Sequence, residues 1–329
     1  MKLRHFTAGV FLALMALSEA QAGASPRLAP DAVNQATVSR QAARSAGRTP
    51  LMLKLQVLLD RAGFSPGLID ARRGSNVLQA LAAYEAENGM KADGRLDEEV
   101  WQKLTEADGE PVLEDYTIAE EDVRGPFVKD IPDDLEAMAK LDKLAYRSPE
   151  ELLAEKFHLD EAVLRALNPG ADFDKAGTKI VVPKLANDRK GEKVARIEVD
   201  KKKKTVRAFD KEDKLVAFYP ATVGSKEKPA PDGTFKVRAV AENPTYYYDP
   251  KDLSFKGVET TEKFKIAPGP NNPVGSVWID LTAKTYGIHG TPDPAAIGKT
   301  SSHGCVRLTN WDARALAKMV SKGTVVDFK

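Results

Sequence analysis

The chain of 329 residues contains a single cysteine, Cys305. One cysteine cannot form an internal disulfide, so the fold cannot depend on a disulfide framework. A lone thiol is either a small buried apolar side chain or a reactive group, and its sequence neighbours must distinguish the two. The Cys-x-x-Cys and His-Glu-x-x-His spacings that are typical of zinc sites are also absent.

An excess of charge of either sign is missing as well. The 49 basic and 48 acidic residues give a net charge of +1. Such a balance argues against a nucleic-acid-binding protein, which normally has a basic surface. The one dense charge run, Lys201 to Lys204, lies between two strand-like segments, and we interpret it as a solvated turn.

Long apolar runs are lacking too. The run from Ala8 to Leu17 is too short to span a membrane, but it follows the basic residues Lys2 and Arg4 and precedes a small-x-small site at residues 20–22. This layout predicts a secretory signal peptide over residues 1–22, and therefore an exported protein without a membrane span after cleavage. No cysteine follows the run, so no site for lipid attachment is expected.

The region before residue 190 predicts mainly helices. Residues 23–50 have little apolar periodicity and predict a flexible leader. Residues 51–106 predict three short helices, and their turn-rich loops resemble those of the peptidoglycan-binding-like helical domain. The segment departs from that family at Ala71, where glycine is usual, and at Tyr84-Glu85, where an aromatic-Gln pair is usual. A helical packing module without a ligand is the alternative.

Residues 107–190 have a second signature. Ser148-Pro149 predicts a helix start, Asn168-Pro169-Gly170 predicts the end of a second helix, and residues 177–183 predict a strand. This order resembles the latter part of a lysin motif (LysM), a small glycan-binding fold. An opening strand at residues 116–118 would imply an insertion of about 28 residues. His158, at a helix end, is expected to be a surface or packing residue.

From residue 191 to 329 the hydrophobic pattern changes to a period of two, which predicts a mostly-β domain. The predicted fold class is therefore multi-domain α+β, with a small three-helix domain, a LysM-like α/β module and a C-terminal mostly-β domain. One helix, predicted at residues 312–320, interrupts the strands.

Two of the four histidines lie within 16 residues of Cys305. A thiol is mostly protonated at neutral pH, and histidine is well matched to accept its proton. Either His289 or His303 can be this base on pattern alone. The missing side chain of Gly304 would let a substrate carbonyl approach, and backbone N–H groups around Gly304 and Cys305 could form an oxyanion hole.

The C-terminal region resembles the L,D-transpeptidase catalytic domain, because it contains His289-Gly290-Thr291 and then Ser302-His303-Gly304-Cys305-Val306-Arg307-Leu308. Further matching segments are residues 231–235, 268–275 and 278–279. The resemblance implies a β-sandwich in which Cys305 is the nucleophile, His289 the proton donor and acceptor, and His303 a supporting residue. Arg307, Ser302 and Gly290 are expected to bind substrate. A lid is expected over residues 242–268, with Tyr246, Tyr247 and Tyr248 facing the substrate.

The resemblance also implies a substrate and a place of action. The expected reaction is 3→3 cross-linking of peptidoglycan tetrapeptide stems in the periplasm, without a cofactor and with acylation by carbapenems. Other acceptors remain open, namely an outer-membrane protein or water. A non-catalytic wall-binding protein, an inert Cys305, a zinc site of His289, His303 and Cys305, and a purely structural ion pair of Arg307 are further alternatives.

Overall fold

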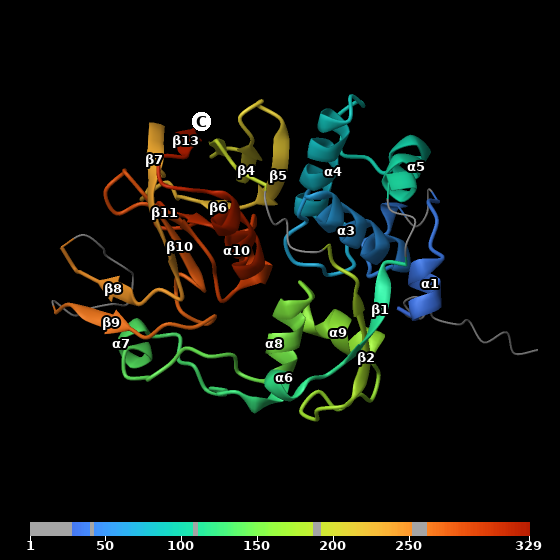
Figure 1. The fold of residues 1–329 in the computed structure, drawn as a ribbon, viewed down its shortest axis with the longest axis horizontal. Helices are drawn as coiled ribbons and strands as arrows, with labels where there is room; N and C mark the ends of the chain where they lie inside the picture. Colours follow the sequence, from blue (N-terminus) through green and yellow to red (C-terminus); the bar gives the residue numbers. More distant parts are fainter. Residues whose placement is uncertain (1–27, 40–42, 108–110, 187–191, 252–261) are drawn as a thin grey trace, which may run out of the picture.

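The computed structural model describes residues 28–39, 43–107, 111–186, 192–251 and 262–329. The predicted signal peptide, residues 1–22, lies outside the described residues. Figure 1 shows a helical N-terminal region in blue, a small α/β region in green, and a mostly-β C-terminal region in yellow to red. Among the described helices, none combines the length and apolar character needed to cross a bilayer.

The three helices predicted over residues 51–106 are confirmed as α3 (Pro50–Ala62), α4 (Ser75–Glu87) and α5 (Glu98–Ala107). Helix α3 begins at Pro50 because the Thr49 side chain accepts a hydrogen bond from Met52 N and proline suits the first helical position. It ends at Gly63, whose φ of 89° is left-handed.

The two departures from the peptidoglycan-binding pattern, Ala71 and Glu85, lie at buried positions. Ala71 is buried with a φ of 60°, a conformation that glycine adopts more easily. Glu85 is only 1% exposed and accepts a hydrogen bond from Gly94 N at 2.8 Å, which a glutamine oxygen could equally do. The usual residues of that family would therefore fit both positions.

The expectation of a flexible leader is wrong for residues 28–39. Helix α1 (Pro30–Asn34) packs against α3, with Leu28 and Val33 buried in the core. The side-chain oxygen of Asn34 accepts hydrogen bonds from Val112 N and Leu113 N, and Lys54 Nζ donates to Asn34 O at 2.7 Å. Residues 28–39 pack on the rest of the protein with few apolar side chains, because many of their contacts are hydrogen bonds between polar groups.

The middle region is a two-stranded antiparallel sheet with two helices between its strands. Strand β1 (Leu113–Thr117) pairs with β2 (Lys179–Pro183), and α8 (Pro149–Lys156) and α9 (Glu161–Leu167) lie between them in sequence. Asn168 ends α9 and joins it to β2, because its side chain bonds to both Leu164 O and Val181 N.

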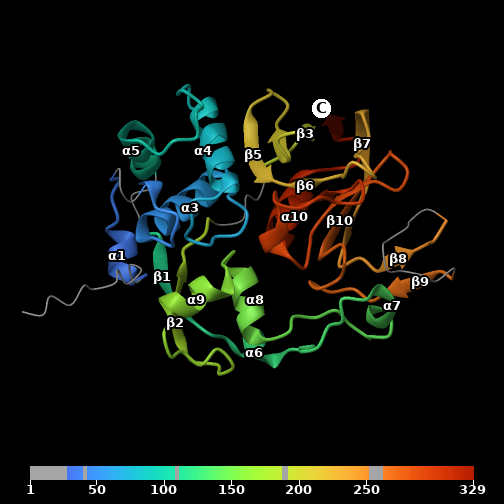
Figure 2. The same cartoon turned by 180° about the vertical axis from the view of Figure 1, so that it is seen from behind.

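The segment between β1 and α8 crosses to the C-terminal region (Figures 1 and 2). It contains α6 (Glu120–Arg124) and α7 (Leu135–Met138), and α7 contacts β9 (Phe264–Ile266), which pairs with β8 (Tyr246–Tyr248). Two backbone bonds fix the crossing, from Leu144 N to Pro268 O at 3.1 Å and from Asn271 N to Leu144 O at 2.9 Å. The insertion therefore fastens the base of the β8–β9 pair.

The C-terminal region has a nine-stranded sheet in the order β5-β4-β3-β13-β7-β10-β11-β12-β6. Its long strand β7 pairs with β13 through its first half and with β10 through its second half, so it belongs to both parts of the sheet. The strands are β3 (Arg196–Asp200), β4 (Thr205–Phe209), β5 (Leu215–Pro220), β6 (Thr222–Val223), β7 (Gly233–Glu242), β10 (Val277–Leu281), β11 (Gly287–His289), β12 (Val306–Arg307) and β13 (Val325–Phe328).

Both parts of this sheet contribute to one buried cluster, which α10 (Asn310–Met319) also joins. The mostly-β domain is thus confirmed, and its predicted sandwich is built from one sheet whose two halves share β7. Lys201 to Lys204 form the expected turn between β3 and β4.

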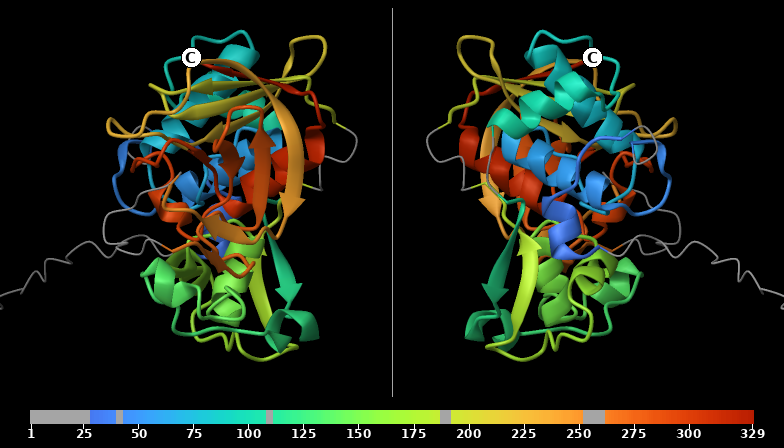
Figure 3. Two further views of the ribbon diagram at one scale, coloured as in Figure 1. Left: turned by 90° about the vertical axis from the view of Figure 1, so that its left-hand side faces the viewer. Right: turned by 90° about the vertical axis from the view of Figure 1, so that its right-hand side faces the viewer.

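The helical and middle regions share a second cluster of buried side chains, which includes Phe218 of β5. Isolated β-bridges join Phe64 to Phe218 and Ile69 to Leu159. Figure 3 shows the helical region behind the sheet and the green middle region beneath both. The three regions are therefore packed together as one body.

Candidate active site

Two short parallel strands carry His289 and Arg307, two of the predicted site residues. In the β11–β12 pair, Ile288 lies opposite Val306 and His289 opposite Arg307. Ile288 and Val306 point into the core, so His289 and Arg307 point to the other face. Cys305 lies in the bend just before β12, two residues from Arg307, so strand alternation would direct its side chain to the same face.

This register also sets the separation of the proposed base and nucleophile. With about 3.3 Å of rise per residue and about 4.8 Å between strands, the Cα atoms of Cys305 and His289 lie roughly 8 Å apart. Diagonal neighbours at this spacing are within reach of long and aromatic side chains. The register is compatible with an imidazole and the single thiol on one side of the sheet, and proton transfer between them stays a prediction.

His289 is held as a neutral imidazole. Its Nδ1 lies 2.7 Å from Gly290 O, and because a carbonyl only accepts, Nδ1 carries the proton and Nε2 is the basic nitrogen. The ring stacks on Trp278 at 5.3 Å between centroids. Burial, with a contribution from the Arg307 charge, lowers the pKa of His289 to about 3, so the ring is unprotonated at neutral pH.

Cys305 is half-buried and protonated at rest. Its Sγ lies 3.7 Å from Thr285 O, and burial raises the pKa of the thiol, against the opposing effects of the Gly287 backbone and Arg307. Thr285 has a φ of 69°, an unusual conformation for a β-branched residue. A neutral thiol beside a neutral imidazole needs proton transfer at the moment of attack, which is general base catalysis.

Ser302 and Gly290 both make structural contacts, and their predicted contacts with substrate stay a prediction. Ser302 is 2% exposed and its hydroxyl donates a hydrogen bond to Cys305 O, so it holds the loop of the nucleophile. A Cβ at Gly290 would lie 2.2 Å from Asn310 Oδ1, so the glycine is needed for packing.

Gly304 is also required by its conformation. Its φ is 105°, and a Cβ there would lie 2.6 Å from Tyr286 Cε1. The absent side chain leaves room for the Tyr286 ring, and the approach of a substrate carbonyl at Gly304 stays a prediction. Trp278, Thr285, Tyr286 and Asn310 were not identified from sequence, because only the packing shows which distant residues face the site.

His303 lies at the exposed side of the same loop. Burial of its ring together with Arg307 and Lys228 lowers its pKa. Within the described residues, no group of three or more His, Cys, Asp or Glu side chains is arranged to hold a metal ion. His289, His303 and Cys305 therefore do not converge as the alternative zinc site would require.

Arg307 supplies a buried cationic donor beside the thiol. The electrostatic partners of the guanidinium are Cys305, Tyr246 and Asp293, and burial lowers its pKa. Its Nε is buried and has no hydrogen-bond partner among the described residues. An unsatisfied buried donor is costly, so this position suits an incoming oxygen atom of a ligand better than a purely structural ion pair.

The expected lid contributes one of its three tyrosines. Burial and the neighbouring Cys305 raise the pKa of Tyr246, which therefore lies at the site. Tyr248 is buried and stacks on Phe264 at 4.6 Å, whereas Tyr247 is 71% exposed. Residues 252–261 of the predicted lid lie outside the described residues.

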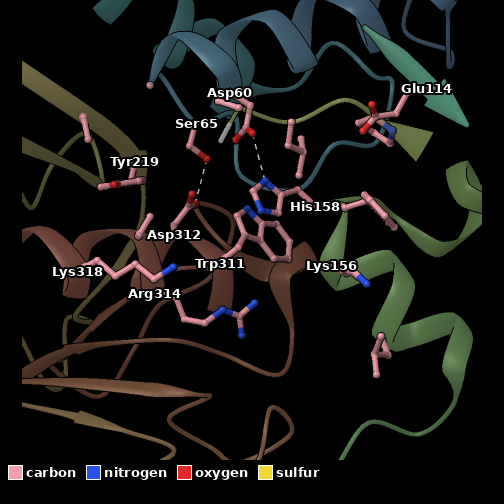
Figure 4. A pocket seen from close by; sticks show the side chains of 18 of the residues that line it. Asp60, Ser65, Glu114, Lys156, His158, Tyr219, Trp311, Asp312, Arg314 and Lys318 are labelled. Atoms are coloured by element: carbon pink, nitrogen blue, oxygen red, sulfur yellow. Dashed lines mark hydrogen bonds and ion pairs between the residues drawn. The ribbon is translucent and has the colours of Figure 1, made fainter. Parts of the chain in front are cut away.

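A cavity of about 600 Å³ lies elsewhere, where the three regions meet (Figure 4). Its wall contains Trp311, whose ring stacks on His158 at 5.0 Å, and His158 Nδ1 lies 3.2 Å from Asp60 Oδ2. His158 is thus the packing residue that was expected. The cavity does not include the proposed catalytic residues, so it is a feature of the inter-region contact.

Comparison with known proteins agrees with two of the three predicted domains, the peptidoglycan-binding and the catalytic one. Residues 194–327 match the YkuD family, described as the L,D-transpeptidase catalytic domain, and residues 48–104 match a peptidoglycan binding domain family. YkuD of Bacillus licheniformis, named as an L,D-transpeptidase, is 31% identical over 178 residues, which cover 54% of this chain and 90% of the relative. YbiS of Escherichia coli K12, also so named, is 28% identical over 186 residues, 55% of this chain and 60% of the relative.

Among solved structures, an L,D-transpeptidase from Mycobacterium smegmatis is 19% identical, covers 48% of this chain and 76% of that one, and has a TM-score of 0.34. So low a score does not establish a shared overall fold, and the assignment rests on the sequence matches. Because its catalytic region matches the YkuD family, and because the 31% identical match covers 90% of the Bacillus licheniformis relative, the chain belongs to the L,D-transpeptidase family.

Proposed function

We propose that this L,D-transpeptidase forms 3→3 cross-links between peptidoglycan tetrapeptide stems through a thioester on Cys305. The observation that supports the proposal most directly is the register of β11 and β12, which pairs His289 with Arg307, two residues after Cys305. The substrate is inferred from the family. The roles of thiol nucleophile, base and cationic donor are assigned to Cys305, His289 and Arg307.

In the first step, Cys305 Sγ attacks the carbonyl carbon between the third and fourth stem residues. The thiol proton passes to His289 Nε2, and the negative charge moves to the carbonyl oxygen, which backbone N–H groups at Gly304 and Cys305 would bind. The C–N bond then breaks, His289 returns the proton to the departing D-alanine amine, and the acyl group remains on the sulfur as a thioester.

In the second step, an amine of another stem attacks the thioester. His289 takes the proton of this amine, the C–S bond breaks, and the proton returns to the sulfur. The neutral resting state of His289 suits both steps, because only an unprotonated imidazole can accept a proton. Arg307 would bind a substrate oxygen through its unpaired Nε, and His303 would support the loop from its exposed side.

The N-terminal regions are proposed to bind the wall. Residues 51–106 would form a peptidoglycan-binding domain, in line with the family match at residues 48–104. Residues 107–190 would form a LysM-like module, supported by two helices between paired antiparallel strands. With the signal peptide at residues 1–22 and the catalytic domain at residues 191–329, the protein would act in the periplasm at the cell wall.

The direct test is incubation of the purified protein with tetrapeptide muropeptides and product analysis by mass spectrometry. We expect 3→3 dimers from the wild type and none from Cys305→Ala, with Ser301→Ala as an exposed control in the same loop. Dimers from Cys305→Ala would disprove the mechanism. Loss of D-alanine without dimers would point to water as the acceptor. An outer-membrane protein would remain a candidate for the main acceptor only if no dimers form.

A carbapenem provides a second test of the nucleophile. Its strained carbonyl should acylate Cys305, which adds one drug mass to the protein in intact-mass spectrometry. The same treatment should leave the mass of Cys305→Ala unchanged. An unmodified wild-type protein would contradict a reactive thiol at this position.

A further inference from the structure

The buried side-chain amide of Asn310 contacts the two backbone segments that flank His289. The side chain of Asn310 is fully buried, and its Oδ1 accepts a hydrogen bond from Ser276 N at 3.1 Å. The same oxygen abuts the backbone at two glycines, since a Cβ at Gly275 or Gly290 would lie 2.1 or 2.2 Å from it. Asn310 therefore fixes the turn and the strand end that flank the catalytic imidazole.

These two backbone segments are the ones that orient the ring. His289 Nδ1 bonds to Gly290 O at 2.7 Å, and a hydrogen bond to the backbone of Val274 also acts on the imidazole. A shift of the turn or of Gly290 would therefore tilt the ring and move Nε2 relative to Cys305. Misplacement of a reacting group by about 1 Å can cost roughly 100-fold in rate.

Asn310 is itself held from another region of the chain. Its Nδ2 donates to Glu155 Oε2 at 2.8 Å, and Glu155 belongs to α8 of the middle region. The other carboxylate oxygen of Glu155 accepts from Tyr146 OH at 2.7 Å and from Arg314 at 3.0 Å. Arg314 donates in turn to Ser276 Oγ at 3.0 Å, so Glu155 reaches the turn by two routes.

The direction of each hydrogen bond fixes the orientation of the Asn310 amide. Ser276 N–H can only donate, so it requires the amide oxygen, and the NH₂ group must then face Glu155. A carboxylate can only accept, which matches that NH₂ group. A glutamine at 155 would supply one oxygen for three donors, and its own NH₂ group would leave one donor facing another.

We propose that Glu155 is a positioning residue for the transpeptidase reaction, which fixes His289 through Asn310 although it lies outside the catalytic domain. The middle region then completes the catalytic domain in addition to any contact with the wall. The inference rests on the proposed function, because it assumes that His289 is the base.

The test compares the second-order rate constant of carbapenem acylation for the full chain and for Glu155→Gln. Because Cys305 is the only cysteine, intact-mass spectrometry reports on this thiol alone. We expect carbapenem acylation of Glu155→Gln to be about tenfold slower at neutral pH. This loss is smaller than the roughly 100-fold or larger factor that a positioned general base contributes, because the base itself remains present. Alkylation by iodoacetamide at about pH 10 should be the same for both proteins, because hydroxide in the solvent then removes the thiol proton and no positioned base is needed.

Two control variants separate positioning from simple docking. Ser65→Ala removes the 3.0 Å hydrogen bond to Asp312, another contact between regions, and Glu150→Gln removes a charge from the same helix, where Glu150 pairs with Arg165. Both should remain within about twofold of the wild type, well short of the tenfold factor that about 1.4 kcal/mol represents.

Each outcome has a definite meaning. Acylation of Glu155→Gln at the wild-type rate would overturn the inference, and so would a parallel change in acylation and alkylation, which would indicate a general disturbance of the fold. If the wild type itself is not acylated, the proposed function fails and the inference falls with it. Slow acylation with normal alkylation would support it.

Discussion

Replacement of Asp312 by asparagine should make the protein more stable above neutral pH. Asp312 lies at the junction of the three regions, where it accepts a hydrogen bond from Ser65 at 3.0 Å (Figure 4). It is 3% exposed, and burial raises its pKa to about 7, with Asp60 adding to the rise and Thr309, His158 and Ser65 opposing it. The folded protein therefore favours the neutral acid.

The sign and size of the effect follow from this shift. A carboxyl group whose pKa is raised on folding contributes stability below its unfolded pKa, and this stability is lost as pH rises through its folded pKa. A rise from 3.8 to about 7, at about 1.4 kcal/mol per pKa unit, corresponds to about 4 kcal/mol between pH 4 and pH 8. Asparagine stays neutral, so it avoids this loss but forfeits part of the hydrogen bonding to Ser65 and Thr309, worth about 1 kcal/mol.

We therefore expect Asp312→Asn to be about 3 kcal/mol more stable than the wild type at pH 8 and about equal or slightly less stable at pH 4. Urea unfolding at a series of pH values measures this difference directly, and taking the difference between the two proteins removes the effect of all other titrating groups. A stability difference that is the same at pH 4 and pH 8 would refute the reasoning.

Three other predictions follow from the same structure. Because the pKa of His289 is lowered to about 3, the rate of carbapenem acylation should not decrease between pH 7 and pH 5. A pH–rate profile should therefore show no fall in rate near the ordinary pKa of histidine. The folding stability that depends on the neutral form of His289 should be lost as pH falls from about 6.5 towards 3. Gly304→Ala should lower the unfolding free energy by roughly 1–3 kcal/mol and slow acylation, because its left-handed backbone and the Tyr286 ring oppose a Cβ; thermal unfolding and acylation kinetics check both. Glu85→Gln should raise the melting temperature at pH 8, because burial raises the pKa of Glu85 while Gly94 N needs only an acceptor; a lower melting temperature would contradict this.

Much of the architecture could be predicted from local patterns. The three N-terminal helices have apolar residues at helical spacing, and Thr49 and Gly63 mark the ends of α3 through local hydrogen bonding and backbone freedom. The alternating pattern beyond residue 191 predicted the mostly-β domain. Periodicity is readable because it reflects one buried face of each element.

Packing between regions could not be predicted in the same way. Residues 28–39 were expected to be flexible, but Asn34 Oδ1 accepts a hydrogen bond from Val112 N and Asn34 O accepts one from Lys54 Nζ. An apolar pattern does not predict such polar contacts. The sandwich is built from one sheet because β7 pairs with two partners along its length, and strand pairing over long sequence distances is not encoded in any single segment.

The sequence by itself determined the chemistry. A single cysteine near two histidines, in a region that matches the L,D-transpeptidase family, predicts a nucleophile and two candidate bases. Only the tertiary structure showed that His289 is a buried neutral imidazole in register with Arg307, that Ser302 and Gly290 make structural contacts, and that Glu155 is hydrogen-bonded to Asn310. The physical reason is that burial, hydrogen-bond direction and electrostatic fields arise between residues far apart in the chain, whereas a motif records only residues that are close in it.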